Sequence, residues 1–214
     1  MQVSLWMTRD PVTVDPKTPA GKALLLMKER KFRRLPVVED DRLVGIVTVN
    51  DLTGGLKYLA GQYDKAHQER HFERMRVEHV MTPSPLTVRS DAPLEEAGRL
   101  MSERKIGGIP VVDQERLVGM LSESDLFRAL AKMLGWGQPG QRFTVLLPQH
   151  GEGHLETILT TLHVRELQLQ SLFTVADYSP TQRLVSFWTT EGAVAEFLED
   201  LRQRGVQILE TPAS

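Results

Sequence analysis

The chain contains an internal repeat that needs no gap to align. Residues 3–56 recur as residues 77–130 with every position shifted by 74, so that Pro11, for example, returns as Pro85. Two copies of one unit usually pack about a pseudo-twofold axis, which leaves a cleft between them. The repeat therefore predicts two equivalent halves, and it directs the search for function to the cleft that they share.

The composition is that of an ordinary soluble protein. Of the 214 residues, 41% are hydrophobic and 25% are charged, and the formal net charge is −2. A charge so close to zero gives neither the basic surface that binds nucleic acid nor the basic face that binds anionic lipid. Because the chain has no cysteine, disulfides, thiolate catalysis and cysteine-ligated zinc are excluded.

The sequence also carries no sign of targeting to a membrane. Its first residues, MQVSLWMTRDP, lack a basic leader followed by a long apolar core, so no secretory signal is expected. No stretch stays apolar for the length that a membrane-spanning helix needs. We therefore expect a cytoplasmic protein whose partners include neither membrane nor nucleic acid.

Each copy of the repeat predicts a βαββα unit. The segments PVTV (11–14) and PLTV (85–88) alternate in polarity as half-buried strands do. An amphipathic helix follows, and then two apolar runs around a charged turn indicate a β-hairpin. A second helix begins near Asp51 or Asp125. Since a unit of about fifty residues has little core of its own, the two copies are expected to pack on each other.

The rest of the chain separates into a linker and a second domain. Residues 61–76 have a weak apolar stripe and interleaved charges of both signs, which indicates a solvated linker helix. A glycine-rich segment at 136–141 marks a domain boundary. Residues 142–211 show the order β-α-β-β-α-β of a ferredoxin-like domain. The predicted fold class is α/β (α+β), with two βαββα repeats forming a pseudo-twofold module beside this smaller domain.

The strongest chemical signal is a hydroxyl three residues before a carboxylate at the end of each repeat's last strand. The pairs are Thr48 with Asp51, and Ser122 with Asp125. A hydroxyl and free N–H groups at a strand-to-helix junction can hold an anion, with help from the helix dipole. A carboxylate at this point can accept hydrogen bonds from two ribose hydroxyls. Stabilisation of the helix N-terminus alone explains the same aspartates, and the sequence leaves this alternative open.

Together these motifs resemble the CBS motif, and the tandem pair resembles a Bateman module. The order PVTV, helix, LPVV and G-x-x-T-x-x-D occurs twice within residues 3–134. In that family the paired repeats form a disc whose cleft binds adenosine derivatives such as AMP, ADP, ATP or S-adenosylmethionine. The resemblance therefore implies a regulatory ligand of this type and no required cofactor.

The resemblance also implies roles for particular residues. Ribose would be bound by Asp51 and Asp125, and phosphate would be contacted by Thr48 and Ser122. The residues implied to surround adenine, through backbone contacts or apolar walls, are Thr13, Val14, Pro36 and Val37 in the first copy and Thr87, Val88, Pro110 and Val111 in the second.

The two copies differ beside the implied phosphate position. Arg33-Arg34 precedes LPVV, whereas Gly107-Gly108 precedes IPVV. In related modules basic residues at this position neutralise phosphate, a task that suits the guanidinium group. The alternative is a solvated basic pair on a loop. If the arginines bind phosphate, one repeat alone supplies the charge, and the two sites are expected to be unequal. One would favour a nucleotide, and the other a less charged adenosyl ligand or none.

The C-terminal part resembles an ACT domain, a small ferredoxin-like module that often binds amino acids at dimer interfaces. Topology carries this resemblance, because the turn PQHGEGHL departs from the usual acidic-x-Pro-Gly turn. Paired CBS repeats followed by an ACT-like domain resemble acetoin-utilisation proteins of the AcuB type. This order implies a metabolic regulator, and both modules imply a homodimer. The expected divisions are CBS repeats at 1–60 and 77–135, linkers at 61–76 and 136–141, and an ACT-like domain at 142–211.

No catalytic set or metal site is predicted. His67 and His71 are four residues apart and His150 and His154 flank a glycine turn, but both pairs are interpreted as solvated residues. The sequence predicts a non-enzymatic sensor that signals to its C-terminal domain or to an unidentified partner protein. Two alternatives remain open: a scaffold whose cleft has lost its ligand, and an amino-acid sensor that acts through the C-terminal domain.

Overall fold

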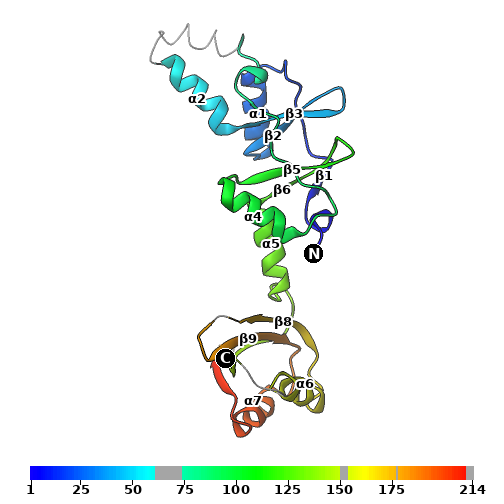
Figure 1. Cartoon of the computed structure of the whole chain (residues 1–214), viewed down its shortest axis with the longest axis vertical. Helices are drawn as coiled ribbons and strands as arrows, with labels where there is room; N and C mark the ends of the chain where they lie inside the picture. Colours follow the sequence, from blue (N-terminus) through cyan, green and yellow to red (C-terminus); the bar gives the residue numbers. More distant parts are fainter. Residues whose placement is uncertain (61–73, 150–153, 177, 211–214) are drawn as a thin grey trace. The chain divides into compact units, whose positions relative to one another are not determined.

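The computed structural model describes residues 1–60, 74–149, 154–176 and 178–210. The chain divides into two compact units, Met1–Phe127 and Arg128–Ser214, and both combine helices with sheets (Figure 1). Most of the predicted linker helix lies outside the described residues. Within the described ranges, no helix is both long and apolar enough to cross a membrane.

The first unit contains one succession of elements twice. Each repeat has a 3₁₀ turn, a short strand, a helix, a β-hairpin and a second helix. In the first repeat these are η1 (Val3–Leu5), β1 (Thr8–Arg9), α1 (Ala20–Arg30), β2 (Arg34–Glu39), β3 (Arg42–Thr48) and α2 (Val49–Ala60). In the second repeat they are η2 (Val77–His79), β4 (Thr82–Pro83), α4 (Leu94–Arg104), β5 (Gly108–Asp113), β6 (Arg116–Ser122) and α5 (Glu123–Met133).

The hairpins fix the register of the strands. Both central residues of the first turn, Asp40 and Asp41, have positive φ angles of 48° and 62°. Positive φ at both positions is the geometry of the tight hairpin turn whose twist matches that of the flanking strands. The resulting register puts Arg34, at the start of β2, opposite Thr48, at the end of β3. Equivalent pairing in the second repeat puts Gly108 opposite Ser122.

The two repeats exchange their N-terminal segments. β1 of the first repeat pairs with β6 of the second, and β4 of the second pairs with β3 of the first, within one six-stranded sheet. Val77 is fully buried in the core of the first repeat. Conversely, the Val3 N–H donates to the carbonyl of Ala92 over 3.0 Å. Each repeat therefore completes the other, in agreement with the expected packing of the copies.

Two glycines make this exchange possible. The sulfur of Met81 lies 2.5 Å from the point that a Cβ atom of Gly45 would occupy. The sulfur of Met7 lies at the same distance from the equivalent point at Gly119. Any larger side chain would push the exchanged segment away from the sheet, which explains why glycine stands in the last strand of both hairpins.

The strands predicted at 11–14 and 85–88 are largely absent. Only Val14 and Val88 form isolated parallel bridges, with Val37 and Val111. Pro11 has no N–H to donate to a strand ladder. Downstream, a turn closed by a hydrogen bond from the Thr18 N–H to the Asp15 carbonyl bends the chain away. The alternation of polarity is real, but only one residue of each segment is paired.

The second unit confirms the predicted order of elements. It contains β7 (Gln141–Pro148), α6 (His154–Val164), β8 (Leu169–Val175), β9 (Gln182–Thr189), α7 (Val194–Gln203) and β10 (Gln207–Glu210). The strands form an antiparallel sheet in the order β10-β7-β9-β8. Its core includes a cluster of three aromatic rings, Phe143, Phe187 and Phe197, with centroids 5.5–5.8 Å apart, surrounded by buried aliphatic residues.

Candidate functional site

Two pockets are formed by residues of both repeats in the first unit. The Asp125 pocket has a volume of about 370 Å³, and the Asp51 pocket has a volume of about 720 Å³. Both volumes lie in the range of about 300–1,000 Å³ that is usual for small-molecule sites. Because the pockets occupy equivalent positions of the duplicated unit, their differences can be compared residue by residue.

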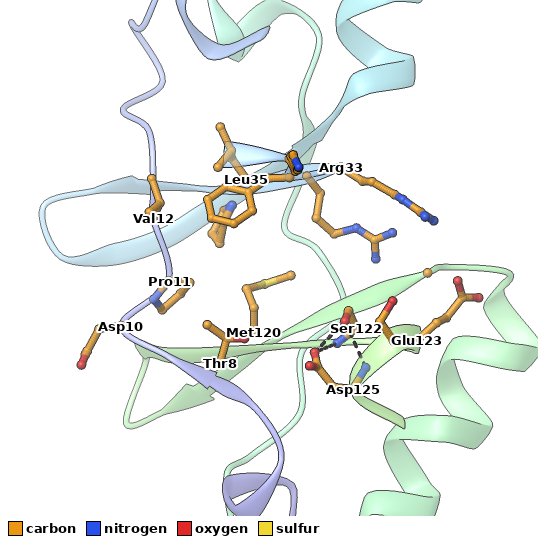
Figure 2. Close-up of a pocket in the computed structure, with 16 residues that line it drawn as sticks. Thr8, Asp10, Pro11, Val12, Arg33, Leu35, Met120, Ser122, Glu123 and Asp125 are labelled. Carbon is orange, nitrogen blue, oxygen red and sulfur yellow. Dashed lines mark hydrogen bonds between the residues drawn. The ribbon is translucent and has the colours of Figure 1, made fainter. Parts of the chain in front are cut away.

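The Asp125 pocket lies between β2 of the first repeat and β6 with the start of α5 of the second. Figure 2 shows Leu35 and Arg33 on one side, and Met120, Ser122 and Asp125 on the other. The segment after β1 closes the pocket. Its lining residues are Asp10, Pro11 and Val12.

The Asp51 pocket repeats this construction with the roles of the repeats reversed. Thr48 and Asp51 come from the end of β3 and the start of α2. Ser84, Pro85 and Leu86 take the positions that the segment after β1 has in the other pocket. Lys105 and Pro110, from around the start of β5, complete the wall.

The predicted hydroxyl and carboxylate pairs form helix caps. The Thr48 N–H and hydroxyl both donate to Oδ2 of Asp51, over 2.8 and 2.7 Å, and the Asp51 N–H donates back to the hydroxyl over 3.2 Å. Ser122 and Asp125 form the same bonds at 2.9, 2.6 and 3.3 Å. This reciprocal arrangement is a capping box. The alternative that the sequence left open, stabilisation of the helix N-terminus, is therefore present in both repeats.

The caps occupy the backbone N–H groups that were predicted to bind an anion. The N–H groups of Thr48 and Asp51 are used within the cap, and the Val49 N–H donates to the Arg33 carbonyl over 3.0 Å. In the second repeat the Glu123 N–H donates to the Gly107 carbonyl over 3.2 Å. These donors were predicted to be free for a ligand, and they are not. Basic side chains are the better candidates for binding a phosphate.

Some predicted lining residues lie elsewhere. The N–H of Val14 donates to the Pro36 carbonyl and its carbonyl accepts from the Val38 N–H, so the Val14 N–H is not free to donate to an adenine edge. Val88 makes the same two bonds in the second repeat. Six predicted residues line neither pocket: Thr13, Val14, Val37, Thr87, Val88 and Val111. Val37 and Val111 are fully buried in the core, whereas the prolines that precede them, Pro36 and Pro110, line the pockets.

Several lining residues were missed by the sequence reasoning. Phe32 lines the Asp125 pocket, and its equivalent Ile106 lines the Asp51 pocket. Lys31 and Lys105 end the preceding helices in the left-handed conformation, with φ of 57° and 53°, and also line the two pockets. A comparison of the two copies column by column would have indicated Glu123, because Val49 stands in its place in the first repeat.

The arginine pair has an unexpected position. Arg33 and Arg34 line both pockets, and so does Gly107. Nη2 of Arg34 lies 2.6 Å from the point that a Cβ atom of Gly107 would occupy. The glycine pair of the second repeat thus provides the room for an arginine of the first. The arginine charge comes from the first repeat alone and borders both pockets, whereas the second repeat contributes Lys105 to the Asp51 pocket.

The surroundings of Arg34 affect its ionisation. Burial lowers the pKa of this guanidinium, the Glu123 carboxylate opposes that change by favouring the charged form, and neighbouring Arg33 adds to the lowering. An arginine nevertheless stays protonated in a protein. Arg34 is therefore a half-buried cation with one acidic neighbour on the side of the Asp125 pocket.

The two pockets differ in charge. Each is lined by three basic side chains: the shared arginine pair and one lysine. Three acidic residues, Asp10, Glu123 and Asp125, balance them in the Asp125 pocket. In the Asp51 pocket Asp51 is the single acidic lining residue among those described. The Asp51 pocket is therefore the more electropositive of the two.

No metal site emerges from the parts of the chain that the structure covers. These residues contain no group of three or more histidine or acidic side chains able to hold an ion. Of the histidines weighed in the sequence, His67, His71 and His150 lie outside the described residues.

The comparison with protein families decides the assignment. The family model of the CBS domain matches residues 2–58 and 77–132, which together are just over half of the chain. The chain belongs to the CBS-domain family. Its two CBS repeats coincide with the two copies recognised in the sequence and with the exchanged repeats of the first unit.

Relatives in sequence cover the CBS pair. A CBS domain-containing protein of Dictyostelium discoideum is 33% identical over 133 residues, which are 60% of this chain and 90% of that protein. The MJ1225 protein of Methanocaldococcus jannaschii is 36% identical over 129 residues, 56% of this chain. The chain matches 45% of the length of MJ1225.

Solved structures match the same region. CBSX2 of Arabidopsis thaliana in complex with AMP is 36% identical, with a TM-score of 0.52, covering 61% of this chain and 96% of that one. An acetoin utilisation protein (AcuB) from Vibrio cholerae is 27% identical, with a TM-score of 0.54 and coverage of 63% and 93%. The CBS pair of MJ0100 with 5′-methylthioadenosine and S-adenosylmethionine is 26% identical, with a TM-score of 0.52 and coverage of 62% and 97%.

Proposed function

We propose that this CBS-domain protein is a non-enzymatic sensor that binds adenosine derivatives in the Asp51 and Asp125 pockets. The observation that carries the proposal is the pair of equivalent pockets, each with an apolar wall, a carboxylate at a helix start and access to the shared arginines. Relatives of known structure were solved with AMP, and with 5′-methylthioadenosine and S-adenosylmethionine, which supports this class of ligand.

In this proposal the carboxylates bind ribose. Asp51 and Asp125 accept their cap bonds through Oδ2, so the carboxylate is held at a fixed orientation at the pocket. Thr48 and Ser122 position the carboxylates and are not the main phosphate ligands. Adenine packs against Pro36 in the Asp125 pocket and Pro110 in the Asp51 pocket, because apolar walls suit a planar base.

The pockets are proposed to select ligands by charge. Among the described residues, Arg33, Arg34 and Lys105 line the Asp51 pocket together with one carboxylate, Asp51, which favours a phosphorylated nucleotide. Balanced charges in the Asp125 pocket favour a ligand with less negative charge, such as adenosine or S-adenosylmethionine. The assignment follows from Coulomb attraction in pockets that are partly shielded from water.

The remaining parts are proposed to transmit the signal. We assign residues 1–60 and 77–135 to the CBS repeats, 61–76 and 136–141 to linkers, and 142–211 to an ACT-like domain of ferredoxin type. The strand order β10-β7-β9-β8 supports this last assignment. Ligand binding would change how this domain or a partner protein docks in a cytoplasmic homodimer. Such coupling requires the ligand to prefer one arrangement of the protein.

A thermal-shift titration tests the proposal. AMP, ADP, ATP, adenosine, S-adenosylmethionine and a set of amino acids are each added to the full chain. A ligand at about 100 times its dissociation constant stabilises the folded protein by about 2.7 kcal/mol. We expect stabilisation by at least one adenosine compound, and its loss in the double variant Asp51→Asn and Asp125→Asn, because the amide keeps an acceptor for the cap but loses the carboxylate.

Other outcomes would replace the proposal. No response to any adenosine compound would favour a scaffold without ligand. A response to amino acids alone would favour a sensor acting through residues after 142. If adenosine compounds still stabilise the double variant, the two carboxylates are not part of the binding site.

A further inference from the structure

The side chain of Arg34 borders both pockets, at the place where the two repeats meet. Arg34 is the first residue of β2, and its equivalent in the second repeat is Gly108, the first residue of β5. Cζ of Arg34 lies 3.0 Å from the point that a Cβ atom of Gly108 would occupy, and Nη2 lies 2.6 Å from the corresponding point at Gly107. One guanidinium therefore lies over the backbone of the opposite repeat.

The duplication would otherwise place a second cation here. With arginine in both copies, two like charges would face each other at close range, which is unfavourable in a partly buried position. Glycine in the second repeat removes that repulsion and leaves space for the single side chain of Arg34. The consequence is that two pockets have access to one half-buried guanidinium.

Glu123 faces this guanidinium from the second repeat. Its Oε2 lies 2.9 Å from the same Cβ point of Gly107 that Nη2 of Arg34 approaches at 2.6 Å. Glu123 lines the Asp125 pocket, and Val49 occupies the equivalent position in the Asp51 pocket. The Glu123 carboxylate thus attracts Arg34 towards the Asp125 pocket, and the equivalent position of the Asp51 pocket holds the uncharged Val49.

We propose that Arg34 is a counter-charge shared by the two pockets, so that a phosphorylated ligand in one pocket weakens the binding of a phosphorylated ligand in the other. This inference rests on the proposed binding of adenosine derivatives. A guanidinium has five donors but a single positive charge, so two phosphates that both approach it share one counter-charge and repel each other. A phosphate in either pocket therefore neutralises much of the charge that would attract a second phosphate into the other.

The coupling depends on the charge of the ligand. Adenosine has no phosphate and does not draw on Arg34, so adenosine in one pocket leaves the affinity of the other unchanged. AMP in one pocket lowers the affinity of the other for AMP, and linkage makes this effect equal in both directions. The chain therefore binds a first nucleotide more tightly than a second.

Isothermal titration calorimetry tests the coupling with AMP and adenosine as probes. Asp51→Asn and Asp125→Asn each leave one working pocket, and their single affinities are compared with the two stepwise affinities of the unmodified chain. For AMP we expect the second step to be at least fivefold weaker than the same pocket measured alone, which is the low end of typical coupling. For adenosine, the affinities should agree.

Two changes at the arginine should abolish the effect on AMP. Arg34→Ala removes the guanidinium. Gly107→Ala adds a methyl group at the point that Nη2 and Oε2 approach, so it displaces Arg34 and Glu123 without changing the net charge. Lys28→Ala removes an exposed cation from α1, outside both pockets, and should leave the coupling intact.

Two results would overturn the inference in different ways. If AMP binds with equal affinity in the single-pocket variants and in the unmodified chain, Arg34 is not shared between the pockets. Coupling that persists in Arg34→Ala would lead to the same conclusion. Both results would leave the sensor proposal standing. Absence of binding heat with both AMP and adenosine would overturn the sensor proposal together with the coupling.

Discussion

The Asp51 and Asp125 pockets have the same scaffold and different charges. Each has a capped helix start, a proline wall and a lysine at the end of a preceding helix. The Asp125 pocket adds Asp10 and Glu123, where the Asp51 pocket has Ser84 and Val49. Duplication has kept the residues that shape the backbone, and the two pockets differ at side chains that line them.

The comparison also separates stability from binding. Each copy has one hydroxyl residue, Thr48 or Ser122, and one aspartate, and in each copy the two residues form a helix cap. Their recurrence is explained by helix stabilisation alone, so it says little about a ligand. The residues that differ, above all Glu123 and the arginine pair, carry the information about what each pocket prefers.

The largest expected effect comes from the carboxylates. Asp51→Ala should weaken adenosine binding in its own pocket by about 100-fold, because hydrogen bonds to a charged group are worth about 1.5–3 kcal/mol each. Asp125→Ala should do the same in the other pocket. Calorimetry measures the loss, and Asp→Asn at each position, which keeps an acceptor for the cap, should show a loss as well if the carboxylate binds ribose. An unchanged affinity in either alanine variant would contradict the ribose role.

Removal of the arginine pair should erase the preference for phosphate. The double variant Arg33→Ala and Arg34→Ala should lose about tenfold or more in AMP affinity in both pockets, and adenosine affinity should change little. The measurement is the ratio of AMP to adenosine affinity at each pocket. If that ratio falls at one pocket only, the arginines do not serve both.

An exchange at one position should make the pockets more alike. Glu123→Gln removes a negative charge from the Asp125 pocket, so its AMP affinity should rise about fivefold, whereas Val49→Glu should lower that of the Asp51 pocket by about the same factor. Measured at low and high salt, both effects should shrink as salt rises, because screening weakens them. Effects of the same sign would refute the charge assignment.

The smallest effect concerns the caps. Thr48→Ala and Ser122→Ala should each lower the free energy of unfolding by about 1 kcal/mol, the usual loss for a capping hydroxyl. Chemical denaturation of the two variants provides the values. Because the hydroxyls are assigned to the caps, AMP affinity should fall far less than in the aspartate variants, and a 100-fold loss in Thr48→Ala would restore a direct ligand role.

Much of the fold was predictable because it depends on local patterns. Hairpins, helices and the order of elements in the second unit followed from periodicity and turn residues. The exchange of N-terminal segments was not predictable, because which repeat Val77 packs against depends on long-range pairing that leaves no mark in its own sequence. The prediction of a strand at 11–14 was largely wrong, because an alternation of polarity does not guarantee that the backbone finds hydrogen-bond partners.

The site was predictable in its residue types more than in its geometry. Eight of the predicted residues line the pockets: Arg33, Arg34, Pro36, Thr48, Asp51, Pro110, Ser122 and Asp125. That Arg34 borders both pockets depends on its direction across Gly107 and Gly108, which one-dimensional sequence does not contain. The sequence showed the contrast between the arginine pair and the glycine pair. Only the structure showed that the two pairs lie against each other across the repeats.

Photoaffinity labelling tests the central claim most directly, because it reports where an adenosine compound binds. The full chain is irradiated with 2-azidoadenosine, with and without excess adenosine, and the modified peptides are identified by mass spectrometry. The account predicts competed labels in the segments that line the pockets, around residues 8–12, 31–36, 82–86 and 105–110. Competed labels confined to residues after 142, or no competed label at all, would contradict it.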